Sequence, residues 1–395
     1  NMNILLMNPY IQYLSFNLFV LFLYLLSLTN LYNINIYFVA YFISILFFFC
    51  IISLKFLNVH KILLKPTSIE KYFKIYNTKT FNLFIIVFFI IGAVATIYQV
   101  TTYGATLFNQ DKVNRINGNH YVNYLANMLQ LSMCMSYVSI KFKTTSYLWF
   151  FRVIFVASIF LLFLKLNRGA YSFMLIVYIY ITYIEAYKLQ RKRRWLLKMG
   201  IIVVAFATAF GIVGNIRLEY VLENIYHTTV NARYGMSEIY PSAFVWVYIY
   251  ITSPLENASQ ILMNQEVWDY HLGFNLFYVF LAPVSKMIWG DHGNLFPPLD
   301  ATAGLNVSTF IPDALVDFGI LGPYVYMIVL VLLYYIAIKS MKNIYGFLCF
   351  LAIVHNSLWL IFANAFSIGS NIIMYIFFLF MSLTSKAPMK REIKN

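Results

Sequence analysis

Uninterrupted runs of about twenty apolar residues recur along almost the entire chain, and this pattern limits what the chain can fold into. A helix of about 20 apolar residues can cross the hydrocarbon core of a bilayer, which is about 30 Å thick. The chain is 62% hydrophobic and only 11% charged, whereas a soluble domain carries about 25% charged residues. A membrane β-barrel would instead show alternating segments of about ten residues. The sequence therefore predicts an all-α polytopic membrane protein, with spans near 8–29, 34–54, 81–99, 120–140, 146–164, 170–187, 199–216, 312–338, 344–362 and 368–385.

The 28 Lys and Arg residues outnumber the 14 Asp and Glu residues, which gives a formal net charge of +14. An excess of this size could indicate binding to nucleic acid, but most of the cations stand in short clusters between the apolar runs. Clusters at alternate turns are typical of the cytoplasmic loops of membrane proteins. We therefore expect both termini to be cytoplasmic and no nucleic-acid partner. The clusters lie near 55–79, 141–143, 188–198, 339–342 and 386–394.

The cysteines and short motifs indicate no metal site. Cys50, Cys134 and Cys349 all lie inside apolar runs, and no two cysteines are spaced as CxxC. Neither a disulfide framework nor a zinc site is therefore indicated. The chain also lacks an HExxH motif and a P-loop. The first apolar run has no basic segment before it and no clear small-residue cleavage site, so we expect the first span there rather than a signal peptide.

The segment 217–311 differs from the rest of the chain, because no cluster of Lys and Arg marks a cytoplasmic turn in it. Seven of the ten prolines fall within it or just beyond it, and the charge pattern predicts that it is extracytoplasmic. Its two apolar stretches, 242–254 and 272–289, could both cross the membrane, which would raise the number of spans from about 10 to 12. They could instead be re-entrant or interfacial helices. We favour this second arrangement because the linker 255–271 is acidic and has no Lys or Arg, unlike a cytoplasmic turn.

Arginines at the outer ends of spans are candidates for binding an anionic group. Arg168 lies in a turn between two spans, Arg217 ends the span before the long segment, and Arg233 follows within that segment. The planar guanidinium group suits bidentate binding of phosphate oxygens, and several around a pyrophosphate would stabilise the charge that develops as it leaves. The alternatives are that Arg168 extends to lipid headgroups and that Arg217 forms a salt bridge with Glu219 or Glu223.

A second polar cluster, Lys-Met-Ile-Trp-Gly-Asp-His-Gly-Asn, begins at Lys286 in the same segment. Asp291 or His292 could act as the general base that activates a hydroxyl, or His292 could donate a hydrogen bond to a phosphate. Lys286 is a candidate for substrate binding, as are Tyr234 and Glu238 earlier in the segment. The alternative is that the cluster is an ordinary glycine-rich turn.

Two aspartates, Asp313 and Asp317, stand at the start of the span that follows the long segment. Residues four apart lie on one face of a helix. Both would be favourable near a helix N-terminus, so capping is an alternative to a role in substrate binding. Asp317 lies deeper in the span and is harder to explain as a cap, which makes it a candidate substrate-binding residue.

Three features together resemble a known family: the Asn-Arg-Gly-Ala turn at 167–170, the long outer segment, and the motif Asp-Phe-Gly-Ile-Leu-Gly at 317–322. In these features the chain is similar to the Wzy-type polymerases, which join the oligosaccharide repeat units of bacterial O-antigen and capsular polysaccharides. The resemblance implies a GT-C-like glycosyltransferase of the cytoplasmic membrane, with 1–395 as a single integral membrane domain. It also implies transfer of the growing chain from undecaprenyl pyrophosphate to a hydroxyl of the incoming unit, at the outer face and without a metal or nucleotide cofactor.

The resemblance also implies roles for single residues and partners. Arg168 matches the family's outer-turn arginine, and Arg217 and Arg233 match outer-loop arginines by layout. The Arg-x10-Gly loop motif of some members does not occur at any of the three. The implied partners are the lipid-linked oligosaccharide, membrane lipids, a chain-length regulator and a flippase. Two other functions stay open: an O-antigen ligase, which uses the same donor, and a transporter, which more often shows internal repeats.

Overall fold

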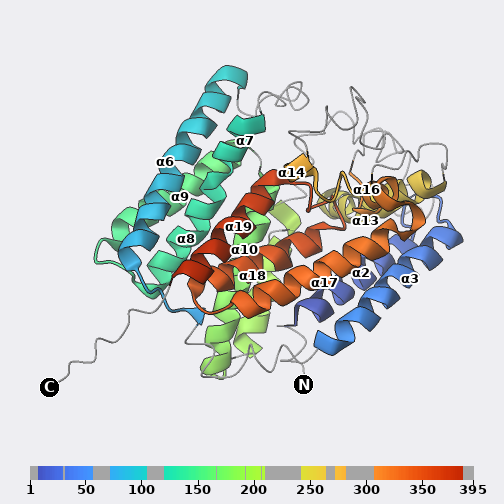
Figure 1. Cartoon of the computed structure of the whole chain (residues 1–395), viewed down its shortest axis with the longest axis horizontal. Coiled ribbons are helices and arrows are strands. Elements are labelled where there is room, and N and C mark those ends of the chain that lie inside the picture. The colour runs from blue at the N-terminus through green and yellow to red at the C-terminus, as the bar shows by residue number, and fades with distance from the viewer. Residues whose placement is uncertain are drawn as a thin grey trace. The chain divides into compact units, whose positions relative to one another are not determined.

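The computed structural model describes residues 8–29, 32–56, 72–104, 120–165, 167–191, 193–205, 207–209, 242–263, 272–281 and 307–385. Every regular element in these ranges is a helix, as Figure 1 shows. The all-α prediction is therefore confirmed for the described residues, whereas the GT-C-like arrangement stays a prediction.

The chain divides into two compact units, each of which combines three separate stretches of sequence. Neither unit is contiguous in the chain, so no single position divides the sequence into an N-terminal and a C-terminal domain. Unit 1 comprises Asn1–Leu63, Glu185–Tyr335 and Asn356–Ile368, and unit 2 comprises Leu64–Ile184, Ile336–His355 and Gly369–Asn395.

In unit 1, helix α2 packs against α3 and α13, and α13 also packs against α16. Asparagines begin the first two of these helices. The Oδ1 atoms of Asn8 and Asn35 accept hydrogen bonds from the backbone N–H groups of Tyr10 and Tyr37, which satisfies donors that the first helical turn leaves free. The elements of unit 1 are α2 (Pro9–Leu25), α3 (Ile36–Ser53), η1 (Leu54–Phe56), α13 (Ser242–Met263), α14 (Tyr278–Leu281), α16 (Ile311–Phe318), η6 (Gly319–Leu321) and most of α17 (Gly322–Ser340).

In unit 2, helix α8 packs against α6 and α9. A Cβ added to Gly92 of α6 would lie 2.7 Å from the backbone nitrogen of Leu129, so glycine permits this close approach. Leu129 also forms a buried cluster with Met133, Leu162 and Ala170, which fixes the start of α10 against α8 and α9. The elements of unit 2 are α6 (Thr78–Tyr103), α7 (His120–Ala126), α8 (Met128–Phe142), α9 (Leu148–Leu164), most of α10 (Arg168–Lys188), most of α18 (Ile344–Trp359) and α19 (Gly369–Thr384).

Several of the described helices are long and apolar enough to cross a membrane. Four segments within the described ranges meet this condition, namely Ile36–Phe56, Thr78–Tyr103, Gly169–Tyr187 and Ile311–Ser340. Shorter apolar helices occupy Pro9–Leu25, Leu148–Leu164, Ile344–Trp359 and Gly369–Thr384. The helices therefore support an α-helical protein embedded in a membrane. The larger number of spans and the cytoplasmic location of the termini stay predictions.

The long outer segment is described in part. The predicted apolar stretch 242–254 lies in α13, which contains Pro254 and continues to Met263. The stretch 272–289 begins with turns at 272–277 and enters α14, and its remainder lies outside the described residues. Whether either stretch crosses the membrane stays a prediction.

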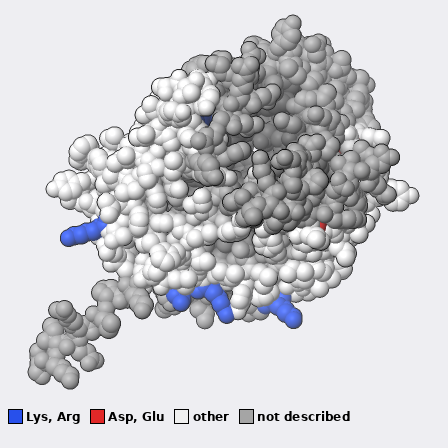
Figure 2. All heavy atoms as spheres, turned by 45° about the horizontal axis from the view of Figure 1, so that its top comes forward, with Lys and Arg blue, Asp and Glu red and all other residues white. Residues whose placement is uncertain are grey.

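Large apolar side chains cover the outside of the described helices. Phe47 of α3 is 65% exposed, Val94 of α6 is 64% exposed and Phe160 of α9 is 60% exposed. Figure 2 shows that most of the described surface on the face drawn belongs to uncharged residues. Extended apolar surface is rare on soluble monomers, so contact with lipid explains this pattern.

Candidate functional site

The turn that carries Arg168 joins α9 to α10 in unit 2. Helix α9 ends at Leu164, and Arg168 is the first residue of α10. Oδ1 of the preceding Asn167 accepts a hydrogen bond from the backbone N–H of Ala170 at 3.2 Å. This is the geometry of a helix N-cap, in which a side-chain oxygen satisfies a free N–H group of the first turn. The motif Asn-Arg-Gly-Ala thus begins a helix, and the positive end of that helix dipole lies at Arg168.

Asn167 also binds the junction between α7 and α8. Its Nδ2 atom donates a hydrogen bond to Oδ1 of Asn127 at 2.9 Å. One side-chain amide therefore caps α10 with its oxygen and holds the α7–α8 junction with its nitrogen. The two bonds fix the position at which α10 begins.

Lys165 adds a second cation to this turn. It is the C-cap residue of α9, three positions before Arg168. Burial lowers the pKa of the Lys165 ammonium group from 10.5 to about 8, because removal from water disfavours the charged form. An anion bound nearby would favour the charged form and raise this pKa again. A lysine, an arginine and a helix N-terminus in one short turn form a combination suited to phosphate.

The first turn of α10 also contacts a buried histidine, His355, which is not among the residues predicted from the sequence. Oγ of Ser172 lies 2.7 Å from Nε2 of His355 on α18 and 2.9 Å from the carbonyl oxygen of Gly169. The hydroxyl has one proton, so when it donates to Gly169 the ring nitrogen donates to Ser172. His355 is 3% exposed. The available signal was the polar triplet His-Asn-Ser at 355–357, since polar residues within an apolar run are costly and often functional.

In unit 1, the apolar segment Ile311–Ser340 is not one continuous helix. Helix α16 ends at Phe318, the 3-10 turn η6 follows, and α17 begins at Gly322. Gly319 has a φ of 61° and a ψ of −151°, which a residue with a side chain adopts only with strain. A Cβ on Gly322 would lie 1.7 Å from the carbonyl oxygen of Ala314. The two glycines of the motif Asp-Phe-Gly-Ile-Leu-Gly therefore make the break possible.

Asp317 lies at this break and is fully buried. Its carboxylate accepts hydrogen bonds at 2.8 Å from the backbone N–H groups of Asn275 and Leu276 and from Oη of Tyr326, and at 3.2 Å from Nδ2 of Asn275. Backbone N–H groups outside a helix need hydrogen-bond acceptors within the protein when they lie at membrane depth. The carboxylate of Asp317 is such an acceptor for the turns at 272–277. These four bonds give Asp317 a structural role that is sufficient to explain a buried carboxylate at this position. The role of Asp317 in substrate binding stays a prediction.

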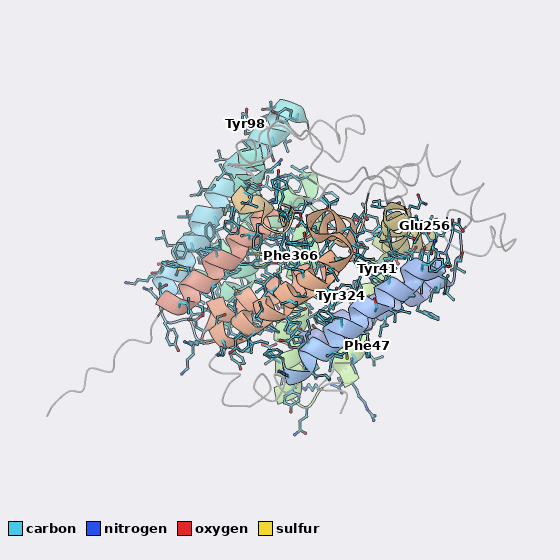
Figure 3. All side chains as sticks on the ribbon, turned by 45° about the vertical axis from the view of Figure 1, so that its right-hand side comes forward. Tyr41, Phe47, Tyr98, Glu256, Tyr324 and Phe366 are labelled. Atoms are coloured by element: carbon cyan, nitrogen blue, oxygen red, sulfur yellow. The ribbon has the colours of Figure 1, made fainter. Side chains whose placement is uncertain are left out.

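A second buried carboxylate, Glu256, lies in α13 (Figure 3). Its Oε2 atom accepts a hydrogen bond from Oη of Tyr24 at 2.7 Å. Its Oε1 atom accepts from the backbone N–H of Asn33 at 3.3 Å and from Nε2 of Gln260 at 2.9 Å. The predicted acidic linker 255–271 includes Glu256, but α13 continues through this position. Glu256 joins α2 and the α2–α3 connection to α13. Because it is a buried structural residue and not a loop residue, it gives no information about the side of the membrane on which 255–271 lies.

The other predicted site residues lie outside the described residues, and their roles stay predictions. Arg168 belongs to unit 2 and Asp317 to unit 1. Within the described ranges, no group of three or more His, Cys, Asp and Glu residues could hold a metal ion. The residues outside the described ranges are Arg217, Arg233, Tyr234, Glu238, Lys286, Asp291 and His292.

Comparison of the chain with protein-family models, curated proteins and solved structures found no match. The described residues by themselves support an α-helical protein embedded in a membrane. Its unit 2 contains a capped, cationic helix start, and its unit 1 contains a broken apolar segment held by a buried aspartate.

Proposed function

We propose that the protein is a membrane glycosyltransferase that polymerises oligosaccharide repeat units carried on undecaprenyl pyrophosphate. It would act at the outer face of the bacterial cytoplasmic membrane. The observation that carries the proposal is the turn before α10, in which Lys165 precedes the capping Asn167 and Arg168 begins the helix. Two cations at a helix N-terminus suit a phosphate group. A lipid-linked pyrophosphate brings such a group to the end of a membrane span.

The proposed reaction is a displacement at the anomeric carbon of the donor sugar. The hydroxyl oxygen of the incoming unit forms a bond to that carbon, and the bond from the carbon to the pyrophosphate oxygen breaks. The electron pair leaves with undecaprenyl pyrophosphate, and the hydroxyl proton goes to a general base, for which Asp291 and His292 are the candidates. Arg168, Arg217 and Arg233 would stabilise the negative charge that develops on the leaving group.

One observation favours a second class of function, a transporter of lipid-linked saccharides. Broken helices with polar groups form the binding sites of many secondary transporters, and the segment Ile311–Ser340 breaks beside the buried Asp317. The carboxylate of Asp317 already accepts four hydrogen bonds from protein groups, which leaves it little capacity for a cargo. The glycosyltransferase is therefore our main proposal.

Replacing Arg168 with Ala should abolish long surface polysaccharide, because the leaving pyrophosphate loses a cation. Loss of one group that stabilises transition-state charge lowers the rate by about 100- to 1000-fold. The variant is expressed in a strain that lacks the chromosomal gene. The measurement is the ladder of surface polysaccharide on a gel, with the amount of protein in the membrane determined in parallel.

Arg194→Ala is the matched control, because Arg194 is an exposed arginine in the helical stretch 193–205, outside the turn. This variant should keep the full ladder. A wild-type ladder from Arg168→Ala at normal protein level would overturn the assignment of that arginine. The gene deletion separates the three functions. A one-unit product without a ladder supports a polymerase, polymer retained on undecaprenyl carrier indicates a ligase, and repeat units confined to the cytoplasmic face indicate a transporter.

A further inference from the structure

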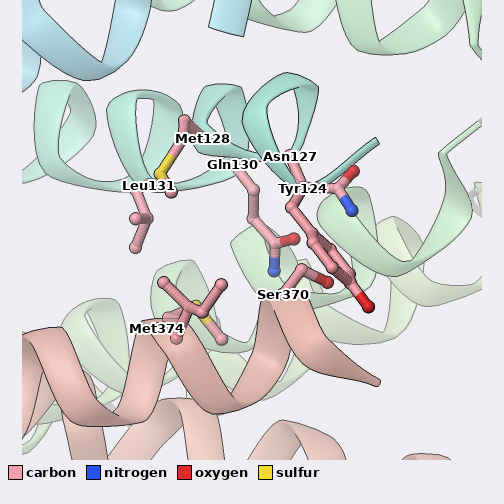
Figure 4. Close-up of a pocket in the computed structure, with 8 residues that line it drawn as sticks. Tyr124, Asn127, Met128, Gln130, Leu131, Ser370 and Met374 are labelled. Atoms are coloured by element: carbon pink, nitrogen blue, oxygen red, sulfur yellow. The ribbon is translucent and has the colours of Figure 1, made fainter. Parts of the chain in front are cut away.

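A small pocket in unit 2 lies between the start of α8 and the start of α19 (Figure 4). The space that a water-sized group can occupy in it is about 10 Å³. This is room for a single water molecule or hydroxyl group. The polar part of its lining comes from Tyr124, Asn127, Gln130 and Ser370.

Gln130 provides the strongest indication of a ligand in this pocket. Its side chain is only 7% exposed, and Figure 4 shows it extending from α8 towards the helix that carries Ser370. Within the described part of the chain, the side-chain amide of Gln130 makes no hydrogen bond, whereas its backbone N–H donates to the carbonyl oxygen of Asn127. Buried polar groups in native proteins nearly always have a partner. The amide of Gln130 is therefore available to a group that enters the pocket.

Two neighbouring side chains add capacity for hydrogen bonds. Oδ1 of Asn127 accepts the bond from Asn167, which leaves Nδ2 of Asn127 as a donor. The hydroxyl of Ser370 has no hydrogen-bond partner among the described residues. Together with Gln130, these groups offer both donors and acceptors but no charge. A neutral hydroxyl, which both donates and accepts, matches this lining better than a phosphate does.

The ring of Tyr124 forms one wall of the pocket. A Cβ on Gly369, the first residue of α19, would lie 2.8 Å from two carbon atoms of this ring. The ring therefore lies against backbone at a position where only glycine leaves enough room. An aromatic wall beside a few neutral polar groups is typical of sites for small polar ligands, because the ring covers C–H groups while the amides bind hydroxyls.

We infer that this pocket binds one hydroxyl group of the incoming saccharide and thereby positions the acceptor for transfer. The inference rests on the proposed function, because it assigns the acceptor side of the same reaction. Asn127 connects the two sides: it lines the pocket and binds Asn167, which caps α10 where Arg168 begins. The pocket and the cationic turn thus share one network of neutral amides.

Replacing Gln130 with Leu tests this inference, because leucine is of similar size but lacks both hydrogen-bonding groups of the amide. The probe is the repeat-unit oligosaccharide of the host, released from its carrier by mild acid. Its binding to the full-length protein in lipid nanodiscs is measured as protection from hydrogen exchange in peptides that cover 120–131 and 367–376. We expect protection in the wild type and an approximately tenfold higher half-saturating concentration in Gln130→Leu, which corresponds to the loss of one neutral hydrogen bond.

Leu125→Ala is the matched control, since Leu125 lies in the same stretch of chain but is 44% exposed and does not line the pocket. It should bind the oligosaccharide like the wild type, and Ser370→Ala should weaken binding in the same direction as Gln130→Leu. Glycerol at equal concentration, which should give no protection, separates the saccharide from any small polyol. Thermal unfolding should show that Gln130→Leu is as stable as the wild type, because the replaced amide has no described partner.

Two results would overturn the inference: unchanged binding in Gln130→Leu, or an equal loss of binding in Leu125→Ala. Failure of the proposed function is a different observation, namely a normal polysaccharide ladder in the strain that lacks the gene. If the ladder depends on the gene while Gln130→Leu supports both normal binding and a normal ladder, the hydroxyl site is wrong and the polymerase proposal stands.

Discussion

Asp317 is a single side chain that holds three parts of unit 1 together. From its place near the end of α16, its two oxygens accept hydrogen bonds from Asn275 and Leu276 in the turns at 272–277 and from Tyr326 of α17. A backbone N–H buried without a partner is destabilising, and two of the four donors are backbone groups. The free energy of unfolding should therefore depend strongly on the carboxylate.

Replacing Asp317 with Asn should destabilise the protein by about 2–4 kcal/mol, because the new NH₂ group faces donors where an oxygen accepted before. The measurement is thermal or denaturant unfolding of the purified protein in detergent. Asp313→Asn is the matched control, since Asp313 lies four residues earlier in the same helix and its carboxylate interacts with one side chain, Asn364, among the described residues. Equal stability of the two variants would contradict the structural role of Asp317.

The burial of Lys165 affects the protonation of its side chain. Burial lowers the pKa of its ammonium group to about 8, so the folded protein holds this proton less tightly than the unfolded chain, whose pKa is near 10.5. Below pH 8 both states carry the proton, and the folded state bears the full unfavourable burial of the charge. Between pH 8 and 10.5 the unfolded state binds more protons, so this unfavourable contribution fades as the pH rises.

Replacing Lys165 with Met should therefore raise the melting temperature most below pH 8, and the gain should shrink as the pH approaches 10.5. Melting curves of both proteins at several pH values between 7 and about 10 measure this. A gain that is independent of pH would indicate improved packing rather than removal of a buried charge. If Lys165 also binds phosphate, the more stable variant should show weaker polymerisation.

The sequence identified Arg168 and Asp317 by residue type and position, but their surroundings required the structure. The Asn-Arg-Gly-Ala turn is recognisable locally because a capping residue and the helix that it caps are adjacent in sequence. The partners of Asp317 lie about forty residues away, in Asn275 and Leu276, and no local pattern pairs them. Gln130 was missed because a lone polar residue in an apolar run has no partner that can be read from sequence, and the partner of His355, Ser172, lies far away in the chain.

Among the helical elements, the segment 311–340 shows how two glycines change a span. Its composition predicts one long membrane helix, and the structure divides it into α16, η6 and α17. The carbonyl oxygen of Ala314 occupies the space where a side chain on Gly322 would begin. The path of the chain after the break therefore depends on the absence of a single methyl group.

Replacing Gly322 with Ala should destabilise the protein by about 3 kcal/mol or more, because the backbone must move to admit the Cβ atom. Gly200→Ala is the matched control. Gly200 lies in the helical stretch 193–205, a Cβ there would meet nothing within 4 Å, and alanine should stabilise the helix by up to about 1 kcal/mol. Unfolding measurements on both variants test this. A stable, fully folded Gly322→Ala protein would show that the break does not depend on this close approach.

Element boundaries could be predicted closely where an apolar run ends at polar residues. The predicted spans 146–164 and 368–385 correspond to α9 (Leu148–Leu164) and α19 (Gly369–Thr384). The predicted span 120–140 is interrupted at Asn127, between α7 and α8. A window of hydrophobicity averages over such a break, because one polar residue or glycine changes the mean very little.

In the molecule as a whole, the apolar composition favours a membrane environment, and contacts between residues far apart in the sequence determine how the helices form the two units. Each of the two units is built from three stretches that are far apart in the chain. In unit 1, for example, Asn257 of α13 binds the carbonyl oxygen of Val307, and the carbonyl oxygen of Leu360 accepts a bond from the backbone N–H of Phe310. Such bonds connect polar groups that a sequence shows only as isolated interruptions of apolar runs.

Local patterns in the amino-acid chain predict a helical membrane protein, the positions of most of its helices, and the place of Arg168 at the start of one of them. Those properties follow from local composition, because helix formation, capping and transfer into lipid depend on residues that are neighbours in the chain. The folded chain alone shows that Asp317 accepts four hydrogen bonds, that 311–340 is broken, and that Gln130 lines a pocket without a described partner. Those properties depend on which residues that are distant in sequence come into contact. A buried polar group without a partner is destabilising, because no water is present to replace the missing hydrogen bond.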